Sequence, residues 1–205
     1  MGPPIQAPAV NGSVFTAADG AELPLRAWLP EDGPPRAVVV ALHGMNDYSN
    51  AFDMPGRFWA GRGVATYAYD QRGFGASSRP GVWSDTDTMI ADLDAAVAAV
   101  AARHPGVPIH LLGESMGGAV VMSALAAPPA PGRRPLSERV ASAVLSAPAV
   151  WGRGSLNPLY RLTLWLAYNT VPGLVLEPPR DLKIRPSDNI EMLRALGRDP
   201  LVIKR

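Results

Sequence analysis

The sequence predicts an α/β fold in which a mostly parallel sheet is covered by helices on both faces. Four apolar runs alternate with longer segments that have helical periodicity. The first run, 37–42, is continuously apolar, as expected for a strand that is buried on both faces. The regular strand–helix alternation is typical of βαβ units. The predicted strands are AVVVAL (37–42), VATYAYD (64–70), VPIHLL (107–112) and VASAVLSAPAV (140–150).

The residues before the first of these strands predict an antiparallel hairpin. Leu23, Leu25, Ala27 and Leu29 alternate with other residues at period two, and Asp19-Gly20 is a hairpin turn signal. The Pro-rich segment 1–12 is expected to be a flexible N-terminus.

Three helices are predicted between the four strands. The first covers much of 50–62 and stops near Gly61 or Gly63. The second runs to about Arg103 and has an N-cap at Ser84, Asp85 or Asp87. Its apolar face repeats at spacings of three and four. The third follows Ser115 and ends near Ala127, because Pro128-Pro129 cannot continue a helix.

The alternation stops after residue 150, so we expect two parts: a core at 13–150 and a partial helical cap or lid at 151–205. The cap contains the apolar stretch LYRLTLWLAYNTVPGLVL, which Arg161, Asn169 and Pro172 interrupt too often for a membrane span. It could line an acyl pocket or contact lipid as a lid, or simply pack against the core.

Composition excludes several classes of function. The 205 residues carry a net charge of +1, so no strong attraction to nucleic acid is expected. The absence of cysteine excludes disulfides, thiolate metal sites and a cysteine nucleophile. No phosphate-binding or zinc-binding motif occurs, and we expect neither cofactor nor metal. The N-terminus does not resemble a signal peptide, which predicts a cytoplasmic protein, with peripheral membrane contact through the cap left open.

The segment HLLGESMGGAV, 110–120, predicts a nucleophilic serine at a strand-to-helix corner. Ser115 follows a buried strand and precedes an Ala-rich helix. Gly113 and Gly117 remove side chains that would crowd the crossing of strand and helix. The alternative is a Gly-rich turn in which Ser115 is an ordinary N-cap.

The segment ALHGMND, 41–47, follows another strand and predicts the second half of an oxyanion hole. The two donors would be the backbone N–H groups of Met116 and Met45. Gly44 would allow this backbone to approach the substrate. We interpret His43 as a structural residue that holds the loop, not as the catalytic base.

Three segments, LHGMNDYSNAF, YDQRGFGASS and LLGESMGGAV, resemble the α/β-hydrolase superfamily. The similarity is greatest to its monoacylglycerol lipase and lysophospholipase-like branch, which is related to the serine aminopeptidases. The resemblance implies that Ser115 is the nucleophile and that Met45 and Met116 form the oxyanion hole. We interpret Asp70, in the strand-end DxRGxG pattern, as a residue that fixes its loop.

The resemblance also implies a catalytic acid and a catalytic histidine, which this sequence does not contain in the expected order. In α/β-hydrolases an acid and then a histidine follow the serine, whereas His43, His104 and His110 all precede Ser115. We therefore expect a C-terminally truncated hydrolase that lacks the triad acid, the histidine and the last strands. A base recruited from elsewhere, such as His43 swung inward, is an alternative. The edge of strand 140–150 would then be exposed and favour self-association.

The predicted reaction is hydrolysis of carboxylic esters through an acyl-Ser115 intermediate. The resemblance implies a small-molecule lipid substrate, either a monoacylglycerol or a lysophospholipid. Short-chain esters and peptides stay open, because the same sheet accommodates all of them. The alternative is a catalytically inactive scaffold that binds lipid or a partner.

Overall fold

The computed structural model describes residues 2–129, 134–150, 157–171 and 187–204. The chain divides into two compact units. One comprises Met1–Ala149 together with Pro200–Ile203, and the other comprises Val150–Asp199 together with Lys204–Arg205. The first unit contains the sheet and the candidate site.

A seven-stranded sheet forms the centre of the first unit, in the order β1-β2-β3-β5-β4-β6-β7. β1, β2 and β3 are antiparallel neighbours, and β3 is also antiparallel to β5. β5, β4, β6 and β7 are parallel, which confirms the predicted fold class. The strands are β1 (Ala9–Asn11), β2 (Val14–Thr16), β3 (Glu22–Trp28), β4 (Ala37–Leu42), β5 (Val64–Tyr69), β6 (Ile109–Glu114) and β7 (Ser142–Ser146).

The central strands are buried because their apolar runs face helices on both sides. Val40 of β4 lies in register with Tyr67 of β5 and Leu111 of β6, and each of these residues is at most 2% exposed. The predicted hairpin is present as β2 and β3. The Pro-rich segment 1–12 is not flexible throughout, as its composition predicts, because Ala9–Asn11 form β1 and pair with β2.

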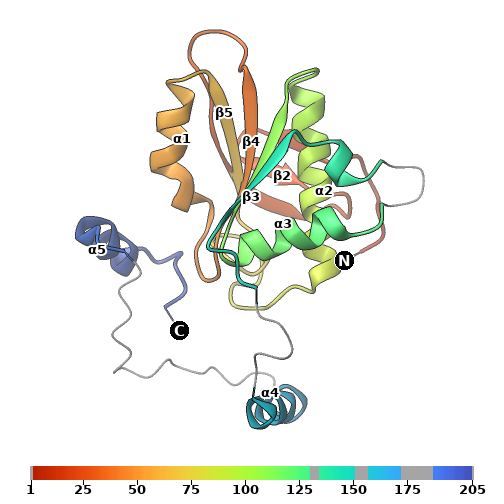
Figure 1. Cartoon of the computed structure of the whole chain (residues 1–205), viewed down its shortest axis with the longest axis vertical. Helices are drawn as coiled ribbons and strands as arrows, with labels where there is room; N and C mark the ends of the chain where they lie inside the picture. Colours follow the sequence, from red (N-terminus) through yellow and green to blue (C-terminus); the bar gives the residue numbers. More distant parts are fainter. Residues whose placement is uncertain (1, 130–133, 151–156, 172–186, 205) are drawn as a thin grey trace. The chain divides into compact units, whose positions relative to one another are not determined.

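Helices cover both faces of the sheet (Figure 1). α1 (Asp53–Ala60) lies on one face, where Gly56 packs so closely on Trp28 of β3 that a Cβ at Gly56 would lie 2.5 Å from the indole ring. α2 (Thr86–Arg103) and α3 (Met116–Ala126) lie together on the other face. Of the three N-caps considered for α2, the structure has Asp85, which accepts a hydrogen bond from the Thr88 N–H at 2.8 Å. Short 3-10 helices occupy Ser49–Phe52 and Leu136–Glu138.

The connections between parallel strands run toward opposite edges of the sheet on the two sides of the β4–β6 pair. From β4 the chain passes through α1 to β5 on one side, and from β6 it passes through α3 to β7 on the other. Neighbouring parallel strands whose connections diverge leave a crevice at their carboxyl ends, where ligands bind. The loops after Leu42 and after Glu114 therefore meet at the expected binding position.

β7 forms an edge of this sheet and is exposed along its whole length. Its inner edge pairs with β6, and Val144 and Leu145 are 56% and 39% exposed. An apolar edge strand of this kind offers unpaired backbone groups to another strand.

The second unit contains α4 (Pro158–Thr170) and α5 (Ile190–Arg198) in its described residues. Each has a side-chain N-cap: Asn157 accepts from the Leu159 N–H, and Asn189 accepts from the Met192 N–H. The large apolar residues of α4 are exposed, Trp165 among them. In the described part of the chain, no helix combines the length and apolarity needed to cross a bilayer.

Candidate active site

Ser115 occupies a strained corner between β6 and α3. Its backbone angles are φ 49° and ψ −112°, a conformation that side-chain-bearing residues rarely adopt. Three hydrogen bonds hold it there: the Ser115 N–H donates to the Ser146 carbonyl at 2.9 Å, and the Ser115 carbonyl accepts from the N–H groups of Ala149 at 2.9 Å and Ala119 at 3.2 Å. A strained residue that its surroundings fix in this way is typical of functional sites.

The glycines around Ser115 permit this corner. A Cβ at Gly113 would lie 2.6 Å from the Gly117 carbonyl oxygen, and a Cβ at Gly117 would collide with the Leu42 carbonyl oxygen. Both obstacles are backbone atoms, which cannot turn aside as a flexible side chain would. The crowding predicted from sequence at these two positions thus has identified partners.

The loop after β4 passes directly against Ser115. A Cβ at Gly44 would lie 3.4 Å from the Ser115 Cβ, at van der Waals contact, so the backbone of this loop lies directly beside the serine. The next residue, Met45, has a 60% exposed side chain and faces the same cavity as Ser115. Met116 is the first residue of α3, where backbone N–H groups have no partner inside the helix. Among the described residues, neither the Met45 N–H nor the Met116 N–H donates a hydrogen bond.

A cavity of about 290 Å³ opens beside Ser115. Its wall is mostly apolar and comes from the loop after β4, the segment around the start of α2, and α3. The lining residues are Met45, Trp83, Thr86, Met89, Ser115, Met116, Ala119, Val120, Ser123 and Ala149.

His43 is fully buried and its ring is engaged on both nitrogens. Nδ1 lies 2.8 Å from the Gly44 carbonyl oxygen, and Nε2 accepts the Gln71 backbone N–H at 3.0 Å. The amide of the Gln71 side chain donates to the His43 carbonyl at 2.9 Å. Burial lowers the pKa of His43 to about 4, so the ring is neutral at pH 7. These contacts agree with the loop-holding interpretation of His43.

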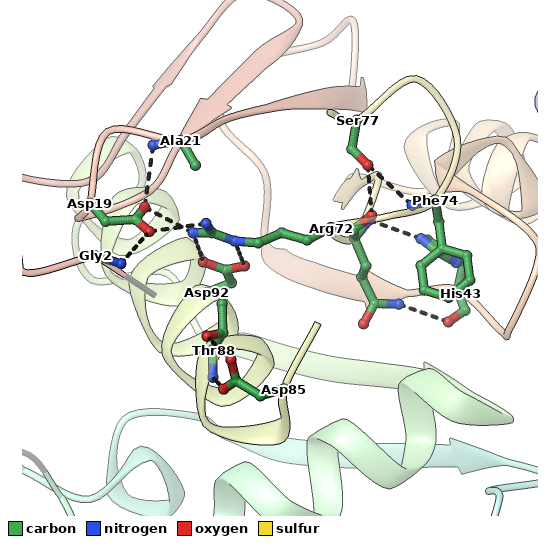
Figure 2. Close-up of polar contacts among 11 residues, drawn as sticks. Gly2, Asp19, Ala21, His43, Arg72, Phe74, Ser77, Asp85, Thr88 and Asp92 are labelled. Carbon is green, nitrogen blue, oxygen red and sulfur yellow. Dashed lines mark hydrogen bonds and ion pairs between the residues drawn. The ribbon is translucent and has the colours of Figure 1, made fainter. Parts of the chain in front are cut away.

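Asp70 and Arg72 fix the loop that follows β5. The Asp70 carboxylate accepts from the Ser49 N–H at 3.0 Å and from the Ala76 N–H at 2.9 Å. Arg72 lies between two carboxylates (Figure 2), with contacts of 2.8 Å to Asp19 and 2.7 Å to Asp92. Arg72 lowers the pKa of Asp19 to about 2, whereas burial raises the pKa of Asp92. The Arg72 guanidinium therefore connects the hairpin, this loop and α2 through its ion pairs.

The other two histidines lie away from Ser115. His104 follows α2 and its Nε2 pairs with the Tyr67 hydroxyl at 2.8 Å. His110 lies near the start of β6, five residues before Ser115, which corresponds to about 16 Å along an extended strand. Its Nδ1 lies 2.8 Å from the Ser142 hydroxyl. None of the three histidine rings, all of them in the described residues, forms a hydrogen bond with Ser115.

Among the acids that follow Ser115, Glu138 pairs with Arg134 at 3.1 Å in the first unit. Glu177 and Asp181 lie outside the described residues. Asp188, Glu191 and Asp199 belong to the second unit.

Several side chains that line the cavity could not be predicted from the sequence. Trp83 precedes α2 and packs edge-on against Phe74, with ring centroids 6.1 Å apart. Met89 and Val120 come from α2 and α3, which are separate in sequence and meet only in the folded chain. The one available signal was a tryptophan in an otherwise Gly-, Ser- and Pro-rich loop.

Comparison with known proteins agrees with this geometry. Residues 33–205 match the family model described as "Serine aminopeptidase, S33". The chain is 28% identical over 190 residues to a monoacylglycerol lipase of Mycolicibacterium smegmatis, covering 92% of this chain and 60% of that protein. It is 31% identical over 163 residues to the human monoglyceride lipase, covering 78% of this chain and 51% of that protein. The chain thus spans between half and two thirds of the length of these curated relatives.

A solved structure supports the fold. The crystal structure of the Paleococcus ferrophilus monoacylglycerol lipase has a TM-score of 0.67 and 23% identity, covering 90% of this chain and 65% of that one. At that identity the likeness concerns the fold alone. The family model, in contrast, covers most of the sequence, including both loops that meet at Ser115. The chain belongs to the serine aminopeptidase S33 family of α/β-hydrolases.

Proposed function

We propose that Ser115 is the nucleophile of a carboxylic-ester hydrolase. The Ser115 Oγ attacks the ester carbonyl carbon and loses its proton to a base, and the alcohol leaves with a proton. Water then attacks the acyl-Ser115 carbonyl, which releases the carboxylic acid and restores the serine hydroxyl. The observation that carries this proposal is the strained Ser115 backbone beside an apolar cavity.

The oxyanion of each tetrahedral intermediate would be stabilised by the backbone N–H groups of Met45 and Met116. Gly44 gives the loop its close approach to Ser115, and Gly113 and Gly117 allow the elbow. Two free N–H groups at a cavity wall, one of them at a helix N-terminus, fit this role.

The proposed substrate is a lipid ester of the monoacylglycerol or lysophospholipid type. The cavity has an apolar wall suited to an acyl chain, and the matched relatives are named as monoacylglycerol or monoglyceride lipases. We propose that residues 13–150, with β1 (Ala9–Asn11) paired onto them, form the core and that 151–205 form a partial cap. The exposed apolar residues of α4, with Trp165 and Tyr168 among them, suit peripheral contact of a cytoplasmic protein with a lipid surface.

The 205-residue chain is proposed to lack the triad acid and histidine. All three histidines precede Ser115 in the sequence, and His43 is engaged on both ring nitrogens. A missing base predicts chemical rescue. Added imidazole should accelerate the reaction of Ser115 with a fluorophosphonate in a concentration-dependent way. A labelling rate that is fast without imidazole and insensitive to it would contradict a missing base.

The test of the nucleophile compares fluorophosphonate labelling of the wild-type chain, Ser115→Ala and Ser142→Ala. Ser142 is the matched control, because it is an exposed serine whose hydroxyl contacts His110 at 2.8 Å. Labelling should vanish in Ser115→Ala and persist in Ser142→Ala. Loss of labelling in Ser142→Ala with retention in Ser115→Ala would overturn the assignment.

A second candidate function is a catalytically inactive scaffold that binds lipid or a partner. The observation that favours it is that no histidine ring hydrogen-bonds to Ser115 in the described part of the chain. It predicts a folded wild-type chain that does not label, even with imidazole, yet binds a monoacylglycerol. Labelling of Ser115 would exclude it.

A further inference from the structure

The Gly44–Met45 peptide is held by its carbonyl oxygen. That oxygen lies 2.8 Å from the Nδ1 atom of His43 and also accepts the Asp47 N–H at 3.3 Å. His43 is 0% exposed, so the carbonyl is turned toward the ring and away from solvent. The hydrogen bond to the ring therefore fixes the rotation of this peptide plane.

The opposite edge of the same peptide carries the Met45 N–H. In a trans peptide the carbonyl and the N–H point in opposite directions, and this peptide is trans. Turning the carbonyl toward the buried ring therefore turns the N–H away from it. Met45 lines the Ser115 cavity, and its N–H has no acceptor among the described residues. The N–H therefore lies on the edge of the peptide opposite the His43 ring, and it belongs to a residue of the cavity wall.

Only one tautomer of His43 satisfies both of its ring contacts. The Gly44 carbonyl can only accept, so Nδ1 must carry the proton. The Gln71 backbone N–H can only donate, so Nε2 must be unprotonated. The side-chain amide of Gln71 holds the His43 backbone as well, at 2.9 Å from its carbonyl oxygen. Gln71 thus fixes both the tautomer and the position of the ring.

Residue 71 is itself fixed by the packed loop around it. Its carbonyl accepts the Ser77 hydroxyl at 3.1 Å and the Phe74 N–H at 3.0 Å. Phe74 packs edge-on against the His43 ring, with centroids 5.6 Å apart. The neighbouring Arg72 is clamped between Asp19 and Asp92. The loop that donates a hydrogen bond to the Nε2 atom of His43 therefore has little freedom to move.

We propose that His43 is a positioning residue: held as the Nδ1–H tautomer by the Gln71 backbone, it rotates the Gly44–Met45 peptide so that the Met45 N–H serves as an oxyanion donor. The inference rests on the proposed function, because it assigns the Met45 N–H to the Ser115 reaction. A histidine that only fills space in the core would have no required tautomer, and its replacement would not rotate this peptide.

The first test uses the wild-type chain and needs no reaction. Long-range ¹H–¹⁵N spectra of histidine-labelled protein report which ring nitrogen carries the proton. We expect His43 to show a protonated Nδ1 and an unprotonated Nε2 between pH 6 and pH 8, approximate limits above its lowered pKa. A protonated Nε2 in that range would overturn the proposal, whether or not Ser115 reacts with any probe.

The second test follows the Met45 N–H in variants, by its residual dipolar coupling and by the kinetics of Ser115 with a fluorophosphonate. His43→Asn keeps an amide N–H near the Nδ1 position, whereas His43→Leu removes the donor. The matched control is His110→Asn, which changes a histidine at the other end of β6.

We expect His43→Leu to change the Met45 coupling and to lower the maximal labelling rate by about 10²-fold, with little change in the concentration for half-maximal rate. His43→Asn should restore most of the wild-type coupling and labelling rate, and His110→Asn should change neither quantity. A folded His43→Leu variant with the wild-type Met45 coupling would overturn the proposal. If wild-type Ser115 fails to label while the coupling changes as expected, the proposed function fails and the positioning of the N–H stands.

Discussion

The backbone strain at Ser115 predicts an unusual order of stabilities for two substitutions. Replacing Ser115 by Ala keeps a Cβ at φ 49° and ψ −112°, whereas replacement by Gly removes it. A residue in such a region costs about 1–3 kcal/mol. Glycine loses about 0.4–1 kcal/mol more backbone entropy on folding. With a strain of about 2 kcal/mol, Ser115→Gly should exceed Ser115→Ala in stability by about 1 kcal/mol.

Ser123 is the matched control, because it lies inside α3 with regular helical geometry. At that position the order should reverse, and Gly should be less stable than Ala by about 1 kcal/mol. The assay is urea unfolding of the four variants, followed by far-UV circular dichroism, with the Gly variant compared to the Ala variant at each site. For a chain of this size about 1 kcal/mol also corresponds to about 2–4 °C in Tm. A Ser115→Gly variant that is no more stable than Ser115→Ala would refute the strain.

Three further predictions concern the loop, the histidine and the sheet edge. Arg72→Met leaves Asp19 and the buried Asp92 without their common partner and should cost about 3–5 kcal/mol in urea unfolding; an unchanged midpoint would contradict the clamp. The pKa of His43 is about 4 in the folded chain against 6.5 unfolded, so the unfolded chain binds more protons between these values. Stability should therefore fall by up to about 3 kcal/mol as the pH drops from 6.5 to 4, and His43→Asn should lack this slope. Val144→Lys places a charge on the exposed edge strand β7 and should reduce the self-association measured by light scattering. A wild-type chain that is monomeric at all concentrations would contradict the prediction that β7 is an interface.

The fold could be predicted because its signals are local. Mostly apolar runs, such as the continuous run 37–42, identify the parallel strands. Pro128-Pro129 ends α3 close to the position that the sequence predicts. β1 could not be predicted, because Ala9–Asn11 is a short strand that is stabilised by its pairing with β2. Short strands carry too few residues for a periodic pattern, so tertiary pairing decides them.

The candidate site could be predicted only in part for the same reason. The positions of Ser115 and Met45 follow from strand ends, because the carboxyl ends of parallel strands meet at one edge. The cavity wall depends on Trp83, Met89 and Val120, which come together only when α2 and α3 pack. The tautomer of His43 likewise could not be predicted from the sequence, because it depends on the backbone N–H of Gln71, 28 residues away.

The central claim is that Ser115 forms the covalent intermediate. The most direct measurement is the intact mass of the chain after reaction with a p-nitrophenyl acyl ester, followed by peptide mapping. If the chain lacks its base, acylation by this activated ester is slow, and deacylation is slower still because the serine alkoxide is a much poorer leaving group than p-nitrophenolate. Over a long incubation one acyl group per chain should therefore accumulate on the peptide that contains Ser115. An unmodified folded chain, or an acyl group on any other residue, would contradict the account.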